Sequence, residues 1–447
     1  MKQDAGNQRG FVRELIGDGV PLLELTAVAL FVSGAFAVFL SFRREFLPHD
    51  VAFLGMGARD LCAIADCRVV RFMFHDRMAF GGTLVAVATL YLWLAAFPLR
   101  QGFVWAWRAF LASGVLGFGS FLAYLGYGYL DSWHGAATLV LLPMYAAGLV
   151  MTRPLAAVRA TGWLQSAAGR QASPSVRLGR WLLLATGASL VLAGVVILYL
   201  GATEVFVAED LGFMGVTRRM LDDVNVRLVP LIAHDRAGFG GGLATTGMLL
   251  LICAWYAPLS RAFHQAVAIA GAAGFGCAIG THFVEGYVNP MHLAPAFAGA
   301  ALFAFGALCE IGGWRRSSTT QDIEVRDSGI SGRGVFARRR FRKGEAVFRW
   351  DLSRKIRRDA IDTLSAEERH FLNPFDEDSF VLVGVPERYV NHSCANNTRV
   401  GQFTDIAIRD ILPGEEITSD YRSGGASIDF ECRCGAPDCR TRTGRDA

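Results

Sequence analysis

The stretch RYVNHSCANN at residues 388–397 is the most informative part of the chain. Tyr389 and Val390 suit the end of a packed strand, but Asn391, His392 and Cys394 follow almost at once. Amide, imidazole and thiol groups in such close succession are costly to bury unless each of them finds a partner. We therefore expect this stretch to belong to a site rather than to an ordinary core.

The residues around this stretch predict a small β-dominated domain of about 120 residues. Short β-type runs alternate with glycine turns over residues 322–350, and further strands are expected in SFVLVGV, RVGQFTDIAIRDI and EEITSDY. The segment RRDAIDTLSAEERHFL has the spacing of a short amphipathic helix. The predicted domain thus combines many short strands with one helix.

Two more motifs of this domain carry possible chemistry. In SGRGVFA, residues 331–337, two glycines one residue apart let the backbone approach a ligand closely, although a plain turn also explains a lone Gly-x-Gly. GEEITSDY, residues 414–421, is a turn and a strand that end in Tyr421. Neither motif is specific alone, so their meaning depends on what accompanies them.

The first part of the chain, residues 1–314, is predicted to be an α-helical membrane bundle. The 447 residues are 52% hydrophobic and 19% charged, with a positive mean hydropathy, which is too apolar for an ordinary soluble enzyme. The apolar residues form blocks of about 20, enough to cross a hydrocarbon layer of about 30 Å. We place eight spans at 22–42, 82–99, 106–127, 134–151, 181–201, 240–257, 263–283 and 291–312. The polar segment RRSSTTQ, residues 315–321, is the expected linker.

The distribution of arginines predicts the orientation of the bundle. Segment 152–180 carries five arginines and no acidic residue, whereas the longer loops 43–81 and 202–239 on the opposite side are rich in Asp and Glu. We expect the basic side to be cytoplasmic. With an even number of spans, both termini and the C-terminal domain also lie in the cytoplasm. The Arg- and Ala-rich composition suggests a bacterial inner-membrane protein.

The two halves of the bundle resemble each other. FLPHDVAFLGM at 46–56 matches FVAEDLGFMGV at 206–216, and HDRMAFGG at 75–82 matches HDRAGFGG at 234–241. GYLDSWH and GYVNPMH, which end at His134 and His292, continue the match at a separation of about 160 residues. We therefore expect two four-span repeats, about 20–152 and 180–313, that run parallel about an axis along the membrane normal.

The repeated polar motifs fall toward the outer face, where buried charges are costly unless they are paired or hydrated. A site could be built from His75, Asp76, His134, His234, Asp235 and His292. Its four imidazoles could bind a metal ion or a haem; alternatively, each His-Asp-Arg could simply cap and pair the loop end. Cys62 and Cys67 could form a disulfide if their loop faces an oxidising compartment.

The C-terminal cysteines predict a zinc site. Cys432, Cys434 and Cys439 cluster in FECRCGAPDC, within the domain assigned to the reducing side. Three closely spaced thiols in that compartment suggest a tetrahedral structural zinc, which needs one more ligand. Cys394 is the other cysteine of this domain and is the expected fourth ligand.

The order Gly-Arg-Gly-Val-Phe, Arg-Tyr-Val-Asn-His-Ser-Cys, Gly-Glu-Glu-Ile-Thr-x-Asp-Tyr and Cys-x-Cys-Gly with a final Cys resembles a SET domain with a post-SET zinc segment. This is the family of S-adenosylmethionine-dependent protein lysine methyltransferases. The resemblance covers about residues 322–440, with the SET part at 322–422 and the post-SET part at 428–441. It implies small β-sheets in which the Asn-His segment and the tyrosine segment cross in a pseudoknot.

The resemblance also implies a role for each motif. The Gly-Arg-Gly turn would hold the methionine end of the cofactor, the Asn-His pair would contact its amino and adenine parts, and a phenylalanine would pack beside it. The implied cofactor contacts are Gly332, Arg333, Gly334, Asn391, His392 and Phe430. Tyr421 would be the active-site tyrosine, and the four cysteines would form one wall of the lysine channel.

Two departures from the family pattern limit what the resemblance implies. Many members carry Tyr or Phe where this chain has Ser419, a position that influences how many methyl groups fit, so the degree of methylation is not fixed. A membrane bundle takes the place of the cysteine-rich cluster that often precedes the domain, so a histone substrate is not assumed.

The sequence is consistent with two alternative functions. The first is a membrane-tethered protein-lysine N-methyltransferase whose partners are a protein lysine and the lipid bilayer, without direct nucleic-acid binding. The alternative is a membrane transporter, or a metal- or haem-binding sensor, with a SET-like regulatory module.

Overall fold

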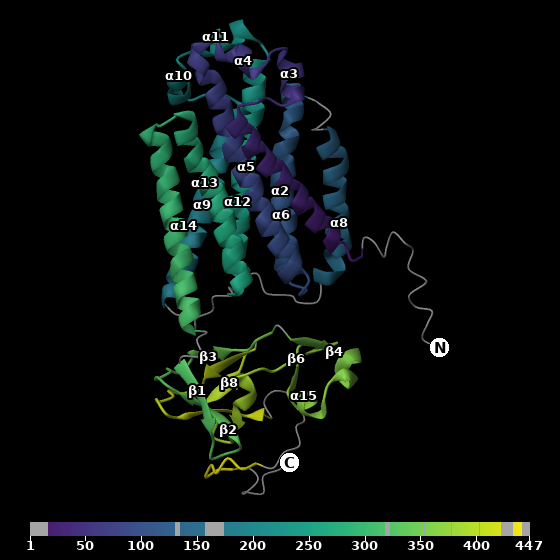
Figure 1. Cartoon of the computed structure of the whole chain (residues 1–447), viewed down its shortest axis with the longest axis vertical. Helices are drawn as coiled ribbons and strands as arrows, with labels where there is room; N and C mark the ends of the chain where they lie inside the picture. Colours follow the sequence, from purple (N-terminus) through teal and green to yellow (C-terminus); the bar gives the residue numbers. More distant parts are fainter. Residues whose placement is uncertain are drawn as a thin grey trace, which may run out of the picture. The chain divides into compact units, whose positions relative to one another are not determined.

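The structure is a computed structural model that describes residues 17–129, 135–156, 174–317, 322–352, 354–376, 378–401, 403–421 and 432–439. The chain divides into two compact units, a helical unit that ends near residue 310 and a β-rich unit that follows it. Both are drawn in Figure 1, and each is described by itself.

Among its described residues, the helical unit contains eight helical segments that are long and apolar enough to cross a membrane, the number predicted from the sequence. Short π- or 3₁₀-helical turns extend some of them: η2 (Ala95–Leu99), η3 (Leu122–Tyr127) and η4 (Ala137–Leu141). The long helices are α2 (Val20–Arg43), α5 (Arg68–Leu94), α6 (Val104–Phe121), α8 (Leu142–Ala156), α9 (Pro174–Ala202), α12 (Leu228–Tyr256), α13 (Arg261–Glu285) and α14 (Pro290–Ser317).

Helices α5 and α12 form the centre of this unit and begin earlier than predicted. Their most apolar windows are 61% and 56% buried, whereas those of the other six segments are 11% to 28% buried. The predicted spans began at residues 82 and 240, but the helices begin at Arg68 and Leu228. Both His-Asp-Arg motifs therefore lie inside central helices, and their placement in loops was wrong.

Two glycine pairs bring helices into backbone contact. On α2 and α5, a Cβ added at Gly34 would lie 2.6 Å from the carbonyl oxygen of Gly81. On α9 and α12, a Cβ added at Gly194 would lie 2.6 Å from the carbonyl oxygen of Gly240. Any larger side chain would force these helices apart, so glycine fixes both crossings.

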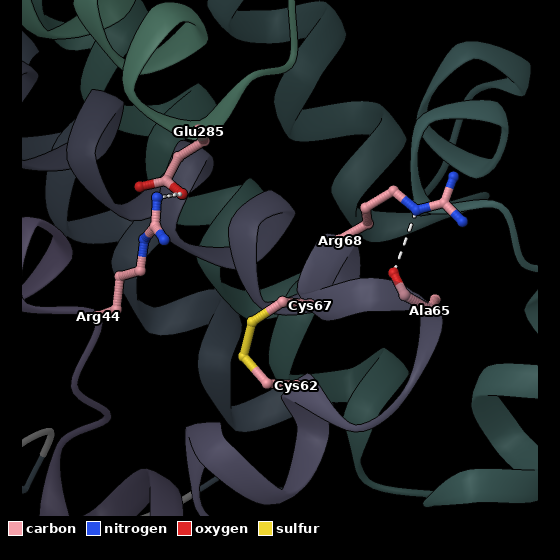
Figure 2. Close-up of a disulfide and its surroundings, with 6 residues drawn as sticks. All are labelled: Arg44, Cys62, Ala65, Cys67, Arg68 and Glu285. Carbon is pink, nitrogen blue, oxygen red and sulfur yellow. Dashed lines mark hydrogen bonds and ion pairs between the residues drawn. A yellow bond between two sulfur atoms is a disulfide. The ribbon is translucent and has the colours of Figure 1, made fainter.

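Short helices close one end of the helical unit: α3 (Pro48–Leu54), α4 (Ala58–Cys62), η1 (Ala65–Cys67), α10 (Ala208–Met214) and α11 (Arg218–Val224). Cys62 and Cys67 are joined by a disulfide in the turn between α4 and α5, as Figure 2 shows. Beside it, Arg68 Nε donates a hydrogen bond of 3.1 Å to the carbonyl oxygen of Ala65. The disulfide thus closes the turn from which α5 starts.

The basic segment expected at 152–180 is only partly a loop. Residues 157–173 lie outside the described part, and α9 already begins at Pro174. Arg180 is buried in that helix, where it pairs with Glu310 and donates to the carbonyl oxygens of Ala254 and Ala257. Its charge is therefore neutralised inside the unit and is no evidence for orientation.

The β-rich unit has a seven-stranded sheet in the order β1-β2-β10-β8-β9-β3, with β7 added beside β10, and a three-stranded sheet in the order β4-β6-β5. Its hydrophobic core includes the fully buried side chains of Val335, Phe341, Ile411 and Ile417. The strands are β1 (Ile323–Asp327), β2 (Arg333–Ala337), β3 (Ala346–Arg349), β4 (Lys355–Arg357), β5 (Leu372–Pro374), β6 (Ser379–Leu382), β7 (Asn391–His392), β8 (Thr398–Val400), β9 (Thr404–Ala407) and β10 (Glu416–Ser419).

Strand β7 pairs in parallel with β10, which places Asn391 opposite Thr418 and His392 opposite Ser419. The Asn-His segment and the tyrosine segment therefore lie side by side, although 25 residues separate Asn391 from Glu416 along the chain. The pseudoknot itself stays a prediction.

The single amphipathic helix expected near residues 357–372 is wrong. The chain forms a 3₁₀ helix, η6 (Arg358–Thr363), and a separate short helix, α15 (Ala366–His370). Ser365 interrupts the helix because its hydroxyl accepts from the Glu368 N–H at 3.1 Å, while the Glu368 carboxylate accepts from the Ser365 N–H at 3.1 Å. This capping box starts a new helix rather than continuing the old one.

Candidate active site

The Gly-Arg-Gly turn lies at the start of β2, and its two glycines meet different constraints, one from the backbone and one from neighbouring side chains. Gly332 has a φ of +48°, a conformation that favours glycine. A Cβ added at Gly334 would lie 2.3 Å from Glu416 Oε1 on the neighbouring strand β10. A side chain at residue 334 would thus displace the Glu416 carboxylate, which Ser328 and Asn391 hold in place.

Asn391 ties this turn to β10. Its Nδ2 lies 3.1 Å from the carbonyl oxygens of Ser331 and Arg333, and 2.8 Å from Glu416 Oε1. The Ser328 hydroxyl also donates to the Glu416 carboxylate, at 2.7 and 2.9 Å from its two oxygens. Because the amide has only two hydrogens, it holds two of its three acceptors at a time.

His392 connects the tyrosine to the cysteine cluster. Its Nδ1 accepts a hydrogen bond of 3.3 Å from the Tyr421 N–H. The proton of the neutral ring is then on Nε2, which lies 3.6 Å from Cys394 Sγ. The ring is buried, so both contacts fix its orientation.

Tyr421 lies at the end of this arrangement, with its ring centroid 5.5 Å from that of His392. Its hydroxyl donates a hydrogen bond of 2.6 Å to the Val390 carbonyl oxygen. Burial, together with the negative charges of Asp405 and Glu416, raises the pKa of Tyr421 to about 12. The phenol is therefore neutral at pH 7 and is suited to hydrogen bonding rather than to proton abstraction.

The four predicted zinc ligands meet in space. The Sγ atoms of Cys394, Cys432, Cys434 and Cys439 all lie within 4.8 Å of one another. Cys432 Sγ is 3.8 Å from Cys394 Sγ and 3.7 Å from Cys439 Sγ. With zinc–sulfur bonds of about 2.3 Å, the edge of a tetrahedral site is about 3.8 Å. These thiols therefore fit a structural zinc.

Two buried carboxyl groups were not found by sequence reasoning. Burial raises the pKa of Asp405 to about 6, against the opposing hydrogen bonds from Trp350 and Thr398. Burial likewise raises the pKa of Glu387 to about 7. For Asp405 a signal existed, since it occupies an inward-facing position of the alternating strand β9.

Phe430, the remaining predicted cofactor contact, lies outside the described residues.

The polar motifs of the helical unit form two sets rather than one. In the first set, Arg77 donates to Asp50 at 2.5 Å and to Asp235 at 2.7 Å. The Tyr129 hydroxyl also donates to Asp50, and His234 lies beside Asp235, with Nδ1 at 3.2 Å from its carboxylate. This set lines a cavity of about 240 Å³.

The second set contains the same types of residue, but each residue comes from the opposite half of the helical unit. Arg236 donates to Asp210 at 2.5 Å, and its Nε lies 3.3 Å from Asp76 Oδ2. The Tyr287 hydroxyl donates to Asp210 at 2.8 Å, and His75 lies beside Asp76. His75, Asp76, Arg236 and Tyr287 of this set line another cavity, of about 440 Å³.

The single four-histidine site is therefore wrong. His234 lines the smaller cavity, whereas His75 and His292 line the larger one, and His134 lies outside the described residues. The residue that sequence reasoning missed is His282, which meets His75 in the larger cavity. The repeat gives no signal for it, because the matching position in the first half of the sequence is Tyr124.

Residues 332–422 match the SET domain family. Relatives of this region are a variant-silencing SET domain-containing protein of Plasmodium falciparum, 27% identical over 147 residues, and histone-lysine N-methyltransferase 2B of Homo sapiens, 32% identical over 142 residues. An H3 lysine-4 specific histone-lysine N-methyltransferase of Schizosaccharomyces pombe is 41% identical over 81 residues.

These alignments cover 28%, 28% and 16% of this chain and only 6%, 5% and 9% of the three relatives. The shared part is thus the SET region, which supports a protein lysine methyltransferase that uses S-adenosylmethionine.

Proposed function

We propose that the chain is a membrane-tethered, S-adenosylmethionine-dependent protein-lysine N-methyltransferase. The observation that carries the proposal is the convergence of three motifs on adjacent strands of the matched SET region. The Gly-Arg-Gly turn on β2, Asn391 and His392 on β7, and Tyr421 after β10 are held together by direct hydrogen bonds.

The proposed chemistry is methyl transfer to a neutral lysine amine. When bound, S-adenosylmethionine supplies the electrophilic methyl group. A lysine with a pKa near 10.4 is deprotonated at pH 7 at a cost of about 4.6 kcal/mol, so a dry channel must favour the neutral amine. Alignment of the amine with the methyl carbon is the main contribution of the protein.

Tyr421 suits an orienting role in this reaction. Its own hydrogen is donated to the Val390 carbonyl oxygen, so the lone pairs of the phenol oxygen remain to accept a hydrogen bond from the substrate amine. Because its pKa is raised to about 12, it does not remove the proton at neutral pH, and we assign that step to water. Gly332, Arg333, Gly334, Asn391, His392 and Phe430 are the proposed cofactor contacts.

We further propose that Cys394, Cys432, Cys434 and Cys439 hold one structural zinc. The metal would tie β7 to the C-terminal segment and so form one wall of the lysine channel. His392, through its Nε2–H near Cys394 Sγ, would couple this wall to Tyr421. The SET and post-SET boundaries remain those of the sequence analysis, 322–422 and 428–441.

The helical unit is the proposed membrane anchor, in a bacterial inner membrane. A disulfide between Cys62 and Cys67 supports an oxidising compartment on that side of the helices. Both termini and the SET domain would then be cytoplasmic, where the cysteines stay reduced. The matched glycine crossings at 34 and 194 support two parallel four-span repeats, 20–152 and 180–313.

The proposed substrate class is a lysine of a protein near the cytoplasmic membrane surface, without direct nucleic-acid contact. The second candidate is that the helical unit is itself the active part, as a transporter or a metal- or haem-binding sensor that the SET domain regulates. Its two cavities are lined by buried charged residues, which are costly inside a membrane unless they serve a function, and this observation supports the alternative.

The test is transfer of radiolabelled methyl groups from S-adenosylmethionine to a host-cell lysate by the full chain in detergent micelles. Tyr421→Phe is the variant, and Tyr199→Phe, an exposed tyrosine on α9, is the matched control. We expect labelled protein bands with the parent and Tyr199→Phe, and none with Tyr421→Phe. Labelling by Tyr421→Phe equal to that by the parent would contradict the assigned site. If the parent binds the cofactor but labels no protein, the second candidate is favoured.

A further inference from the structure

Two buried histidines of the helical unit face each other. His75 on α5 and His282 on α13 are 8% and 6% exposed, and their Nε2 atoms are 3.2 Å apart. The rings meet edge to face, at an interplanar angle of 67°. Such a close approach of two ring nitrogens requires an explanation in terms of protons or of a bound ion.

The opposite nitrogens define the tautomers. His75 Nδ1 lies 3.0 Å from Asp76 Oδ1, and His282 Nδ1 lies 2.7 Å from the Tyr287 carbonyl oxygen. A carbonyl and a carboxylate can only accept, so both Nδ1 atoms carry the hydrogen. In the neutral rings both Nε2 atoms then present lone pairs to each other, an arrangement that is stable only when the two nitrogens share a proton or a metal ion.

The geometry favours a metal ion. With metal–nitrogen bonds of about 2.0–2.1 Å, nitrogens 3.2 Å apart subtend about 100° at the metal, close to the tetrahedral angle. Histidine ligands of metals usually donate their other N–H to a carboxylate or a backbone carbonyl, and these are the partners of His75 and His282.

A third imidazole is within reach. His292 on α14 has its ring centroid 6.3 Å from that of His282, and its buried Nδ1 has no hydrogen-bond partner among the described residues. The adjoining cavity of about 440 Å³ leaves room for a side-chain rotation and for a water ligand. The neighbouring Arg236, Asp76 and Asp210 together carry one net negative charge, which partly balances a divalent cation.

We propose that His75, His282 and His292 bind a divalent transition-metal ion of the zinc class inside the helical unit. Imidazole nitrogens suit such ions, and three protein ligands leave one position open to the cavity. The site belongs to one half only. Counting back from the paired tyrosines, Tyr129 and Tyr287, the sequence position that matches His282 is Tyr124.

The test is zinc binding to the full chain in detergent, after removal of metals and dialysis against Zn²⁺, with elemental analysis of the protein. We expect about two ions per chain, one at the four cysteines and one at the histidines. His75→Gln and His282→Gln should each retain about one ion, the one at the four cysteines. Cys394→Ser should also retain about one ion, the one at the histidines. The matched control His234→Gln should keep both ions, because His234 lines the other cavity.

X-ray absorption at the zinc edge of Cys394→Ser gives a measurement that does not depend on how the histidine variants fold. Nitrogen and oxygen neighbours without sulfur are expected. The proposal is overturned if the parent binds one ion and Cys394→Ser binds none, or if the remaining ion of Cys394→Ser has sulfur neighbours. No methyl transfer is measured in either experiment, so the result is independent of the proposed enzyme activity.

Discussion

Replacing Asn391 by alanine should weaken both the β-rich unit and its affinity for the cofactor. The amide holds two of three acceptors at a time, of which Glu416 is charged and the carbonyl oxygens of Ser331 and Arg333 are neutral. A hydrogen bond to a charged group contributes about 1.5–3 kcal/mol and a neutral one about 0.5–1.5 kcal/mol. The expected loss is therefore about 2–4 kcal/mol, since the side chain is only 8% exposed.

Hydrogen exchange of the full chain, read by mass spectrometry on peptides that contain β7 and β10, measures this loss. A destabilisation of about 2–4 kcal/mol corresponds to exchange about 30 to 1,000 times faster, if exchange follows opening of these strands. Because the Gly-Arg-Gly turn also loses its anchor, calorimetric titration with S-adenosylmethionine should show an affinity reduced by about tenfold or more, equivalent to about 1.4 kcal/mol.

The chain offers a matched control in Asn397, which is 1% exposed. Its Nδ2 donates to the Glu416 carbonyl oxygen at 2.7 Å, and its Oδ1 accepts from the Thr418 N–H at 2.9 Å. Asn397→Ala should accelerate exchange to a similar degree, yet leave the affinity of the folded protein within about twofold, because these hydrogen bonds hold β10 and the residue before it rather than the Gly-Arg-Gly turn. Equal losses of affinity in both variants would refute the assignment of Asn391 to the cofactor site.

Three further predictions concern the same unit. Gly334→Ala places a methyl group 2.3 Å from Glu416 Oε1 and should abolish methyl transfer, whereas Gly329→Ala, with nothing within 4 Å, should leave the rate unchanged. Cys394→Ser should lose the zinc of the post-SET segment, measured by elemental analysis, and with it most methyl transfer, while retained zinc at sulfur ligands would contradict the assignment. Because burial raises the pKa of Asp405 to about 6, above its unfolded value of 3.8, the protonated form is favoured on folding. The contribution of Asp405 to stability should therefore fall by up to about 3 kcal/mol as the pH rises from about 4 to above 6. Asp405→Asn should remove this contribution from denaturant unfolding curves and leave that of Glu387, whose pKa burial also raises.

The parts that could be predicted from sequence are those with local signals. The four thiols predicted to bind zinc lie together, and the glycines, the Asn-His pair and the tyrosine were brought together as expected. Long apolar runs likewise gave the number of helices in the described residues that are long and apolar enough to cross a membrane. Each motif is a local signal, read from adjacent or periodic residues. The convergence of motifs that are far apart in the chain was expected only from the resemblance to the SET family.

The starts of α5 and α12 could not be predicted in this way. Hydropathy assigns a penalty to His, Asp and Arg, so the predicted spans began after the motifs. In the structure these charges are compensated by partners from distant segments, such as Asp50 for Arg77 and Asp210 for Arg236. Pairing of this kind is a tertiary property, and it lets a central helix carry charges that a single-sequence window treats as a boundary.

The arrangement of the His-Asp-Arg motif also follows from helix geometry. Adjacent residues of an α-helix point about 100° apart, so Asp76 and Arg77 on α5 face different neighbours. Arg77 therefore reaches Asp235 in one set, while Asp76 reaches Arg236 in the other. On α12, Asp235 and Arg236 likewise face different neighbours, so that Asp235 joins the first set and Arg236 the second. Each motif therefore contributes to both cavities.

This reciprocity links the two cavities through α5 and α12. A rotation of either helix that improved one ion pair would disturb the other, so the sets at Asp50 and Asp210 are expected to change together. An ion at His75 would act on Asp76, and through it on Arg236 and Asp210. The helical unit thus contains a contiguous polar path from the proposed metal site to both halves, which a simple anchor would not need.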